Sequence, residues 1–162
     1  MKPPARRMAG NHVRIHCLLF LCTGNYYRSR FAEQVFNAHA AVATLPWLAT
    51  SAGLALERGV NNVGPIAPSV VEALRTRQIV LPEPLRFPIQ VQEPDLAAAD
   101  LIIALCEAEH RTVLAQRFPG WLDRVEYWQV DDLHLTPVTE AFAAIEREVT
   151  ALLERLRYVR DT

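Results

Sequence analysis

The sequence has little lysine, few cysteines and no long apolar run, and each shortage argues against a class of function. Lys2 is the only lysine beside sixteen arginines, and it lies in an N-terminal stretch that we expect to be unstructured, which argues against Schiff-base chemistry. Three cysteines in 162 residues are too few for a disulfide framework and favour a reducing, cytoplasmic location. No apolar run is longer than that of Cys17–Cys22, far short of a membrane span.

Charge and composition are those of an ordinary folded domain. The formal net charge is −1, from 17 basic and 18 acidic side chains, so no positive excess favours nucleic acid. Hydrophobic residues make up 51% and charged residues 22%, as in globular proteins. We therefore expect a disordered tail over residues 1–12 and one domain over residues 13–160, with no nucleic acid or membrane as partner.

Short apolar runs alternate with longer segments of helical periodicity. The pattern predicts strands at 13–21, 47–52, 101–105 and 125–130, and helices at 29–42, 67–77, 95–99, 107–118 and from 138 onward. This alternation predicts an α/β fold: a single-domain, doubly wound, four-stranded parallel sheet with helices on both faces. Because such sheets place their sites beyond the carboxyl ends of the strands, the loops of interest are 22–29, 53–66, 106–110 and 130–137.

The loop after the first strand has the residues of an anion-binding cradle. It leaves a buried strand and enters a helix, so its backbone N–H groups converge on one point. We expect Cys22 to be a thiolate there, Arg28 to bind two oxygens of a tetrahedral anion, and Ser29 to donate a hydrogen bond to the sulfur. The candidate phosphate-binding residues are Thr23, Gly24, Asn25, Tyr26, Tyr27, Arg28 and Ser29. The alternative is a structural Cys22 with a salt-bridged Arg28.

Several segments resemble low-molecular-weight protein tyrosine phosphatases. They are Leu19–Asn25 (LFLCTGN), Arg28–Ser29, Ala32–Glu33, Thr50–Gly53 (TSAG), Asp100–Ala104 (DLIIA) and Glu109–Arg111 (EHR). The resemblance covers residues 14 to about 157. It implies a phosphomonoesterase with no metal or cofactor, which forms a cysteinyl-phosphate on Cys22. Its partners would be a phosphorylated protein or a small aryl phosphate, with inorganic phosphate or sulfate as bound anion.

Asp131 and Asp132 directly follow the last predicted strand and are the candidates for a general acid. The resemblance implies that the acid is the aspartate of an Asp-Pro pair at this place. Asp131 matches that aspartate, while Asp132 stands where proline is expected. We favour Asp131 and keep Asp132 as the alternative; helix capping or a solvated loop charge is the structural explanation for the pair.

Four departures from the pattern of the resembled family concern the loop and its support. Tyr27 replaces a cysteine that often pairs with the nucleophile, and Arg30 replaces the usual proline. A histidine that supports the loop in many relatives is missing, which leaves Asn25 and Ser51 to hydrogen-bond beneath it. The loops at 54–62 and 133–136 lack the usual aromatic residues. Tyr26 and Tyr27 can wall the pocket instead, unless one of them packs into the fold.

The five histidines show no metal-ligand spacing, so we assign no metal ligand. Two other functions stay open beside a phosphatase. One is arsenate reduction with an external thiol, since Cys106 is the only cysteine downstream of the loop. The other is a non-catalytic phosphate-binding module.

Overall fold

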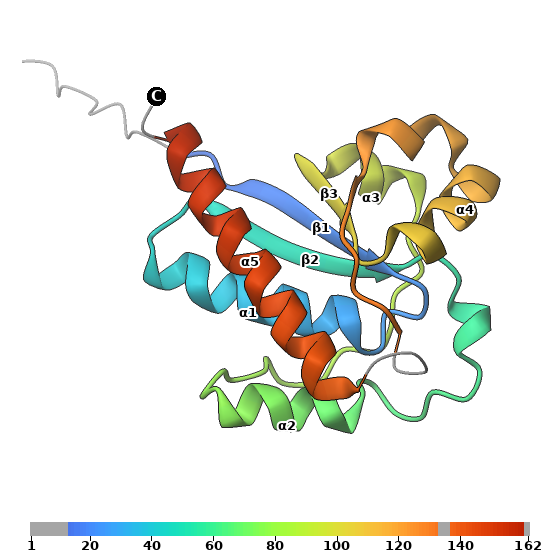
Figure 1. The fold of residues 1–162 in the computed structure, drawn as a ribbon, viewed down its shortest axis with the longest axis horizontal. Coiled ribbons are helices and arrows are strands. Elements are labelled where there is room, and N and C mark those ends of the chain that lie inside the picture. Colours follow the sequence, from blue (N-terminus) through green and yellow to red (C-terminus); the bar gives the residue numbers. More distant parts are fainter. Residues whose placement is uncertain (1–12, 133–136, 161–162) are drawn as a thin grey trace, which may run out of the picture.

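A four-stranded parallel sheet with the order β2-β1-β3-β4 forms the centre of the fold (Figure 1). The computed structural model describes residues 13–132 and 137–160. The strands are β1 (His16–Cys22), β2 (Trp47–Gly53), β3 (Leu101–Ala104) and β4 (Glu126–Tyr127). In the register, Cys22 lies beside Gly53 and Leu21 beside Ala104. The carboxyl ends of the three longer strands therefore meet at one edge of the sheet.

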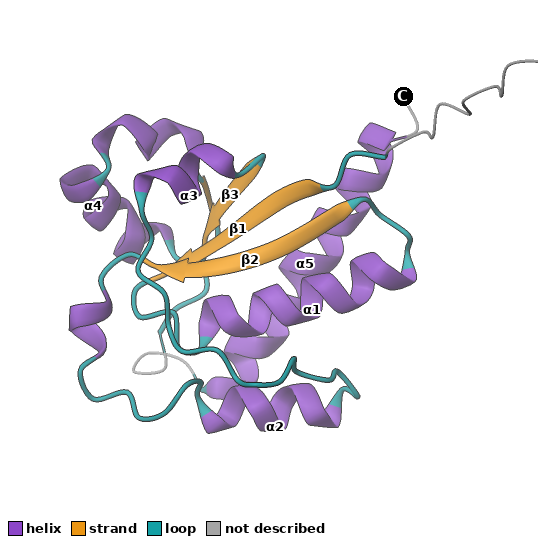
Figure 2. Ribbon diagram, turned by 180° about the vertical axis from the view of Figure 1, so that it is seen from behind, coloured by secondary structure: helices purple, strands orange, loops and turns teal. Residues whose placement is uncertain are grey.

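Helices cover both faces of this sheet (Figures 1 and 2). One face carries α1 (Arg28–Val42), α2 (Pro68–Thr76) and α5 (Val138–Arg160), and the other carries α3 (Glu93–Ala98), α4 (Glu107–Arg117) and the 3-10 helix η2 (Pro119–Arg124). A second 3-10 helix, η1 (Leu56–Gly59), follows β2.

The alternation of side chains along β1 explains the two layers. Leu18 and Phe20 pack into the core under α1 and α5, whereas Leu19 and Leu21 pack into the core under α3 and α4. All four are almost completely buried, as expected for a central strand that is covered on both faces.

The predicted doubly wound α/β architecture is confirmed, but the predicted ranges of two strands were wrong by more than one residue. β1 begins at His16 rather than at residue 13, and Val13 and Ile15 are exposed. β4 covers only Glu126–Tyr127 instead of 125–130. The parallel ladder ends because Gln129 bridges Cys106 in the antiparallel sense.

The loop predicted over 53–66 contains η1, and the predicted turn at 95–99 is the short helix α3. The expected tail at residues 1–12 lies outside the described residues. Within the described ranges, no helix has the length and apolar character needed to cross a membrane.

Candidate active site

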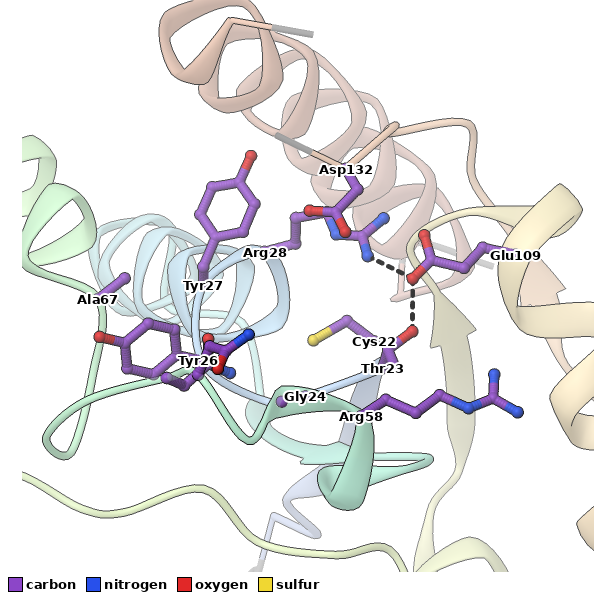
Figure 3. Close-up of a pocket in the computed structure, with 13 residues that line it drawn as sticks. Cys22, Thr23, Gly24, Tyr26, Tyr27, Arg28, Arg58, Ala67, Glu109 and Asp132 are labelled. Carbon is purple, nitrogen blue, oxygen red and sulfur yellow. Dashed lines mark hydrogen bonds and ion pairs between the residues drawn. The ribbon is translucent and has the colours of Figure 1, made fainter. Parts of the chain in front are cut away.

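A pocket of about 400 Å³ opens at the carboxyl edge of the sheet (Figure 3). Much of its wall is the predicted anion-binding loop between β1 and α1, which contributes Cys22, Thr23, Gly24, Tyr26, Tyr27 and Arg28. Arg58 of η1, Glu109 of the first turn of α4 and Asp132 of the loop after β4 complete the lining. The topology thus brings the candidate nucleophile together with the candidate anion clamp and one of the two candidate acids.

The sulfur of Cys22 is held by a hydrogen-bonded chain beneath the loop. Asn25, in a left-handed conformation with φ 49°, donates from Nδ2 to Ser29 Oγ (2.8 Å) and to Ser51 Oγ (3.0 Å). Ser29 Oγ lies 2.9 Å from Cys22 Sγ. The Ser29 oxygen accepts from Asn25, which leaves its own proton free to be donated to the sulfur.

Arg28 is fixed at the first turn of α1 by two acceptors. Its side chain is buried; NH1 donates to the Val130 carbonyl (2.9 Å) and NH2 to Glu109 Oε1 (2.8 Å). Burial alone would lower the pKa of Arg28, but the bond to Glu109 and the nearby Cys22 raise it above its ordinary value. The guanidinium is therefore charged and oriented, and the rest of its planar fork can bind two oxygens of an anion.

Glu109 is the anchor of Arg28, and the sequence analysis did not identify it as a site residue. Its Oε1 also accepts from Thr23 Oγ1 (2.5 Å). Burial alone would raise the pKa of the Glu109 carboxyl, but His110 and Arg28 hold it well below its usual range. Glu109 lies in the first turn of α4, within the segment 106–110 that follows β3 at the carboxyl edge of the sheet, and this position was the signal that could have identified it.

His110 supports Glu109 from inside the fold. Its fully buried ring accepts at Nδ1 from the Cys106 backbone N–H (3.0 Å), so the proton of the neutral ring is on Nε2. Nε2 lies 3.5 Å from Glu109 Oε1 and makes no hydrogen bond within the described part of the chain. Burial lowers the pKa of His110, despite the nearby carboxylate.

We expect this neutral His110 to make the fold acid-sensitive. The unfolded chain takes up the histidine proton first, so the stability is present above about pH 6.5 and is lost as the pH falls. For one proton the loss approaches about 1.4 kcal/mol per pH unit. The free energy of unfolding should be measured against pH for the wild type and for His110→Asn, which keeps an acceptor for Cys106.

The difference between the two curves isolates His110. Glu109 shifts stability in the same direction, but only below its ordinary pKa of 4.5. Curves that stay parallel between about pH 7 and about pH 5 would contradict a buried neutral His110.

The structure separates the two candidate acids. The Asp132 side chain lines the pocket above Cys22 and Arg28 (Figure 3). Asp131 is exposed and is not among the residues that line the pocket; its Oδ1 lies 3.8 Å from Cys106 Sγ. The backbone therefore presents Asp132 to the site, although the resemblance points to Asp131.

Tyr26 and Tyr27 both line the pocket, in different ways. The Tyr26 hydroxyl donates to the Val63 carbonyl (2.6 Å), which fixes the ring at the rim. Tyr27 is buried and packs against Phe142, with ring centroids 5.6 Å apart. Burial raises the pKa of Tyr27 to about 12, so the phenol is neutral. The pocket thus has an aromatic wall, and Tyr27 also belongs to the core.

Two further arginines near the loop were missed. Arg58 of η1 lies at the rim of the pocket, and Arg86 donates hydrogen bonds to Asn25 and Ser51 beneath the loop. Neither belongs to a recognisable motif. Over residues 13–132 and 137–160, no group of three or more His, Cys, Asp or Glu side chains is arranged to hold a metal ion.

Comparisons with known proteins agree with this geometry. A protein-arginine-phosphatase of Bacillus subtilis (strain 168) is 32% identical over 108 residues, which is 67% of each chain. The crystal structure of YfkJ from Bacillus subtilis is similar with a TM-score of 0.77 and 26% identity, covering 91% of this chain and 98% of that one. A low molecular weight protein tyrosine phosphatase from T. tengcongensis has a TM-score of 0.72 and 25% identity, over 86% and 99% of the two chains.

The family profile extends over nearly the whole described domain. Low molecular weight phosphotyrosine protein phosphatases, as a family, match residues 17–160. This range includes the cradle loop, both candidate acids and all five helices from α1 to α5. The chain therefore belongs to the low molecular weight phosphotyrosine protein phosphatase family.

Proposed function

We propose that the protein is a metal-free protein tyrosine or aryl phosphatase that works through a cysteinyl-phosphate on Cys22. The observation that carries the proposal is that the Cys22 sulfur, with the Ser29 hydroxyl 2.9 Å away, shares one pocket with the buried, charged Arg28. A thiolate beside a fixed guanidinium, inside a loop of backbone N–H groups, is suited to a phosphoryl group.

In the first step, Cys22 Sγ attacks phosphorus in line with the leaving oxygen. The S–P bond forms as the P–O bond breaks, and Asp132 gives its proton to the departing oxygen. Arg28 and the loop N–H groups stabilise the charge on the equatorial oxygens. In the second step, Asp132 takes a proton from water, which attacks phosphorus and breaks the S–P bond. Inorganic phosphate leaves, and the thiolate is restored.

The pocket walls favour an aromatic leaving group. Tyr26 and Tyr27 supply flat apolar surface on one side of the cradle, and such rings pack well against a phenyl group. Phosphoarginine is the second candidate substrate, because the similar Bacillus subtilis protein is a protein-arginine-phosphatase.

Hydrolysis of paired peptides, one with phosphotyrosine and one with phosphoarginine at the same position, tests the proposed function. With a chelator present throughout, we expect turnover of the phosphotyrosyl peptide, with kcat/KM about tenfold or more above that of the phosphoarginyl peptide. The reverse preference would replace the tyrosine proposal with an arginine one. Phosphate binding without turnover of either peptide would contradict a phosphatase function and favour a binding module.

A further inference from the structure

Arg86 lies in the proline-rich segment between α2 and α3 and is not among the residues that line the pocket. Its NH1 donates to Asn25 Oδ1 (3.1 Å), and its NH2 donates to Ser51 Oγ (3.0 Å). Two-thirds of its side chain is buried. One guanidinium therefore holds two members of the chain of hydrogen bonds that ends at the Cys22 sulfur.

These contacts fix the direction of the hydrogen bonds that the Asn25 amide makes in that chain. Asn25 Oδ1 accepts from Arg86 and from the Ile89 backbone N–H (3.1 Å), so the amide must present Nδ2 to Ser29 and Ser51. An inverted amide would place N–H groups against two donors. With the amide oriented, the Ser29 oxygen is an acceptor and its proton is left for Cys22.

Arg86 is itself clamped by buried groups. Arg30, buried at the start of α1, donates from NH2 to the Arg86 carbonyl (2.6 Å) and from NH1 to the Pro65 carbonyl (3.0 Å). Glu33 Oε1 lies 3.6 Å from Arg86 NH2. Burial and the neighbouring Arg86 lower the pKa of Arg30 to about 10, so it stays charged at neutral pH. Two cations and one carboxylate leave an excess of positive charge beneath the nucleophile.

We propose that Arg86 is a positioning residue: it orients the Asn25 amide, and through this amide it positions the Ser29 hydroxyl against the Cys22 sulfur and keeps the sulfur reactive. An arginine stays charged at pH values where a histidine would lose its proton. The hydrogen bonds from Arg86 to Asn25 and Ser51 are therefore kept at these pH values. The proposal rests on the proposed role of Cys22 as nucleophile, but it concerns the state of the sulfur and can be read without turnover.

Alkylation of Cys22 by iodoacetamide, followed against pH by peptide mapping, tests the proposal, because only the thiolate reacts. We expect Arg86→Met to slow the alkylation of Cys22 about tenfold at neutral pH. Arg86→Lys keeps a point charge without the planar fork, and we expect about a threefold effect. Arg75→Met is the matched control, since Arg75 is exposed and pairs with Glu72 on the surface of α2; its profile should equal that of the wild type.

The route through Ser29 is tested by a double-mutant cycle. In a Ser29→Ala background, Arg86→Met should change the alkylation rate less than twofold, because the hydrogen bond between residue 29 and the Cys22 sulfur is already lost. Full additivity of the two substitutions would contradict a route through Ser29. The other charged or titratable groups around the sulfur are unchanged in all variants; they are Tyr26, Tyr27, Arg28, Arg30, Arg58, Glu109, His110 and Asp132.

An unchanged alkylation profile in folded Arg86→Met, or in Arg86→Lys should the methionine variant fail to fold, would overturn the proposal. Melting temperatures of each variant report folding. If only the proposed function is wrong, the result is different. Alkylation of Cys22 then still depends on Arg86, but the protein hydrolyses no phosphate ester.

Discussion

Cys22→Ser is expected to lose at least about 10⁴-fold in kcat/KM for every phosphate monoester that the wild type hydrolyses. The serine hydroxyl is far less ionised than a thiolate and is a much weaker nucleophile toward phosphorus. The cradle around it is built by other residues, so we expect Cys22→Ser to keep its fold and its affinity for inorganic phosphate. Steady-state kinetics and calorimetric titration with phosphate measure the two effects separately.

Cys17→Ser is the control for this substitution. Cys17 lies at the start of β1, at the opposite end of the strand from the pocket, and we expect its activity to stay within about twofold of the wild type. Activity that persists in Cys22→Ser would disprove the cysteinyl-phosphate route. Loss of phosphate affinity together with activity would mean that the substitution damages the cradle rather than the chemistry.

Asp132→Asn is expected to lose about 10²- to 10³-fold in kcat on phosphate esters of poor leaving groups and much less on those of very good ones. A poorly stabilised oxygen needs a proton as the P–O bond breaks, whereas an acidic phenol leaves without one. The physical reason for choosing Asp132 is its place in the pocket lining above Cys22 and Arg28. The measurement is kcat for a series of aryl phosphates that differ in leaving-group acidity.

Asp131→Asn is the matched variant, with the same chemical change one residue earlier. Asp131 is exposed, and its Oδ1 lies 3.8 Å from Cys106 Sγ, so we expect little change of kcat along the same series. A steep dependence on leaving group in Asp131→Asn, with none in Asp132→Asn, would return the acid role to Asp131. No dependence in either variant would contradict a carboxylate acid from this loop.

The pattern of apolar residues predicted the architecture because it indicates which residues are buried. For the same reason it gave the wrong range for β4. Residues 125–130 are rich in β-branched and aromatic side chains, and Trp128 and Val130 are indeed buried in the core. Only Glu126–Tyr127 form the regular parallel ladder with β3. Trp128 and Val130 still donate backbone hydrogen bonds to the Ala104 and Leu105 carbonyls, but the next bridge, between Gln129 and Cys106, is antiparallel. The pattern of hydrophobicity indicates which side chains are buried, and it does not show where regular parallel pairing ends.

The loop at 22–29 could be predicted because its chemistry lies in consecutive residues, where a strand end and a helix start set the geometry. Glu109 and Arg86 could not be assigned roles in the same way. They contact Arg28 and Asn25 across sequence separations of 81 and 61 residues, so their roles depend on the packing of distant loops. The choice between Asp131 and Asp132 depends on how the backbone turns after β4, which residue types do not determine.

Mapping the phosphoenzyme is the most direct test of the central claim. Asp132→Asn should be mixed with an aryl phosphate that has a very good leaving group, so that the intermediate forms quickly and breaks down slowly, and then quenched and digested. The account predicts one phosphoryl group on the peptide that carries Cys22, and none on that peptide from Cys22→Ser. A phosphoryl group on any other residue, or hydrolysis with no covalent intermediate under these conditions, would contradict it.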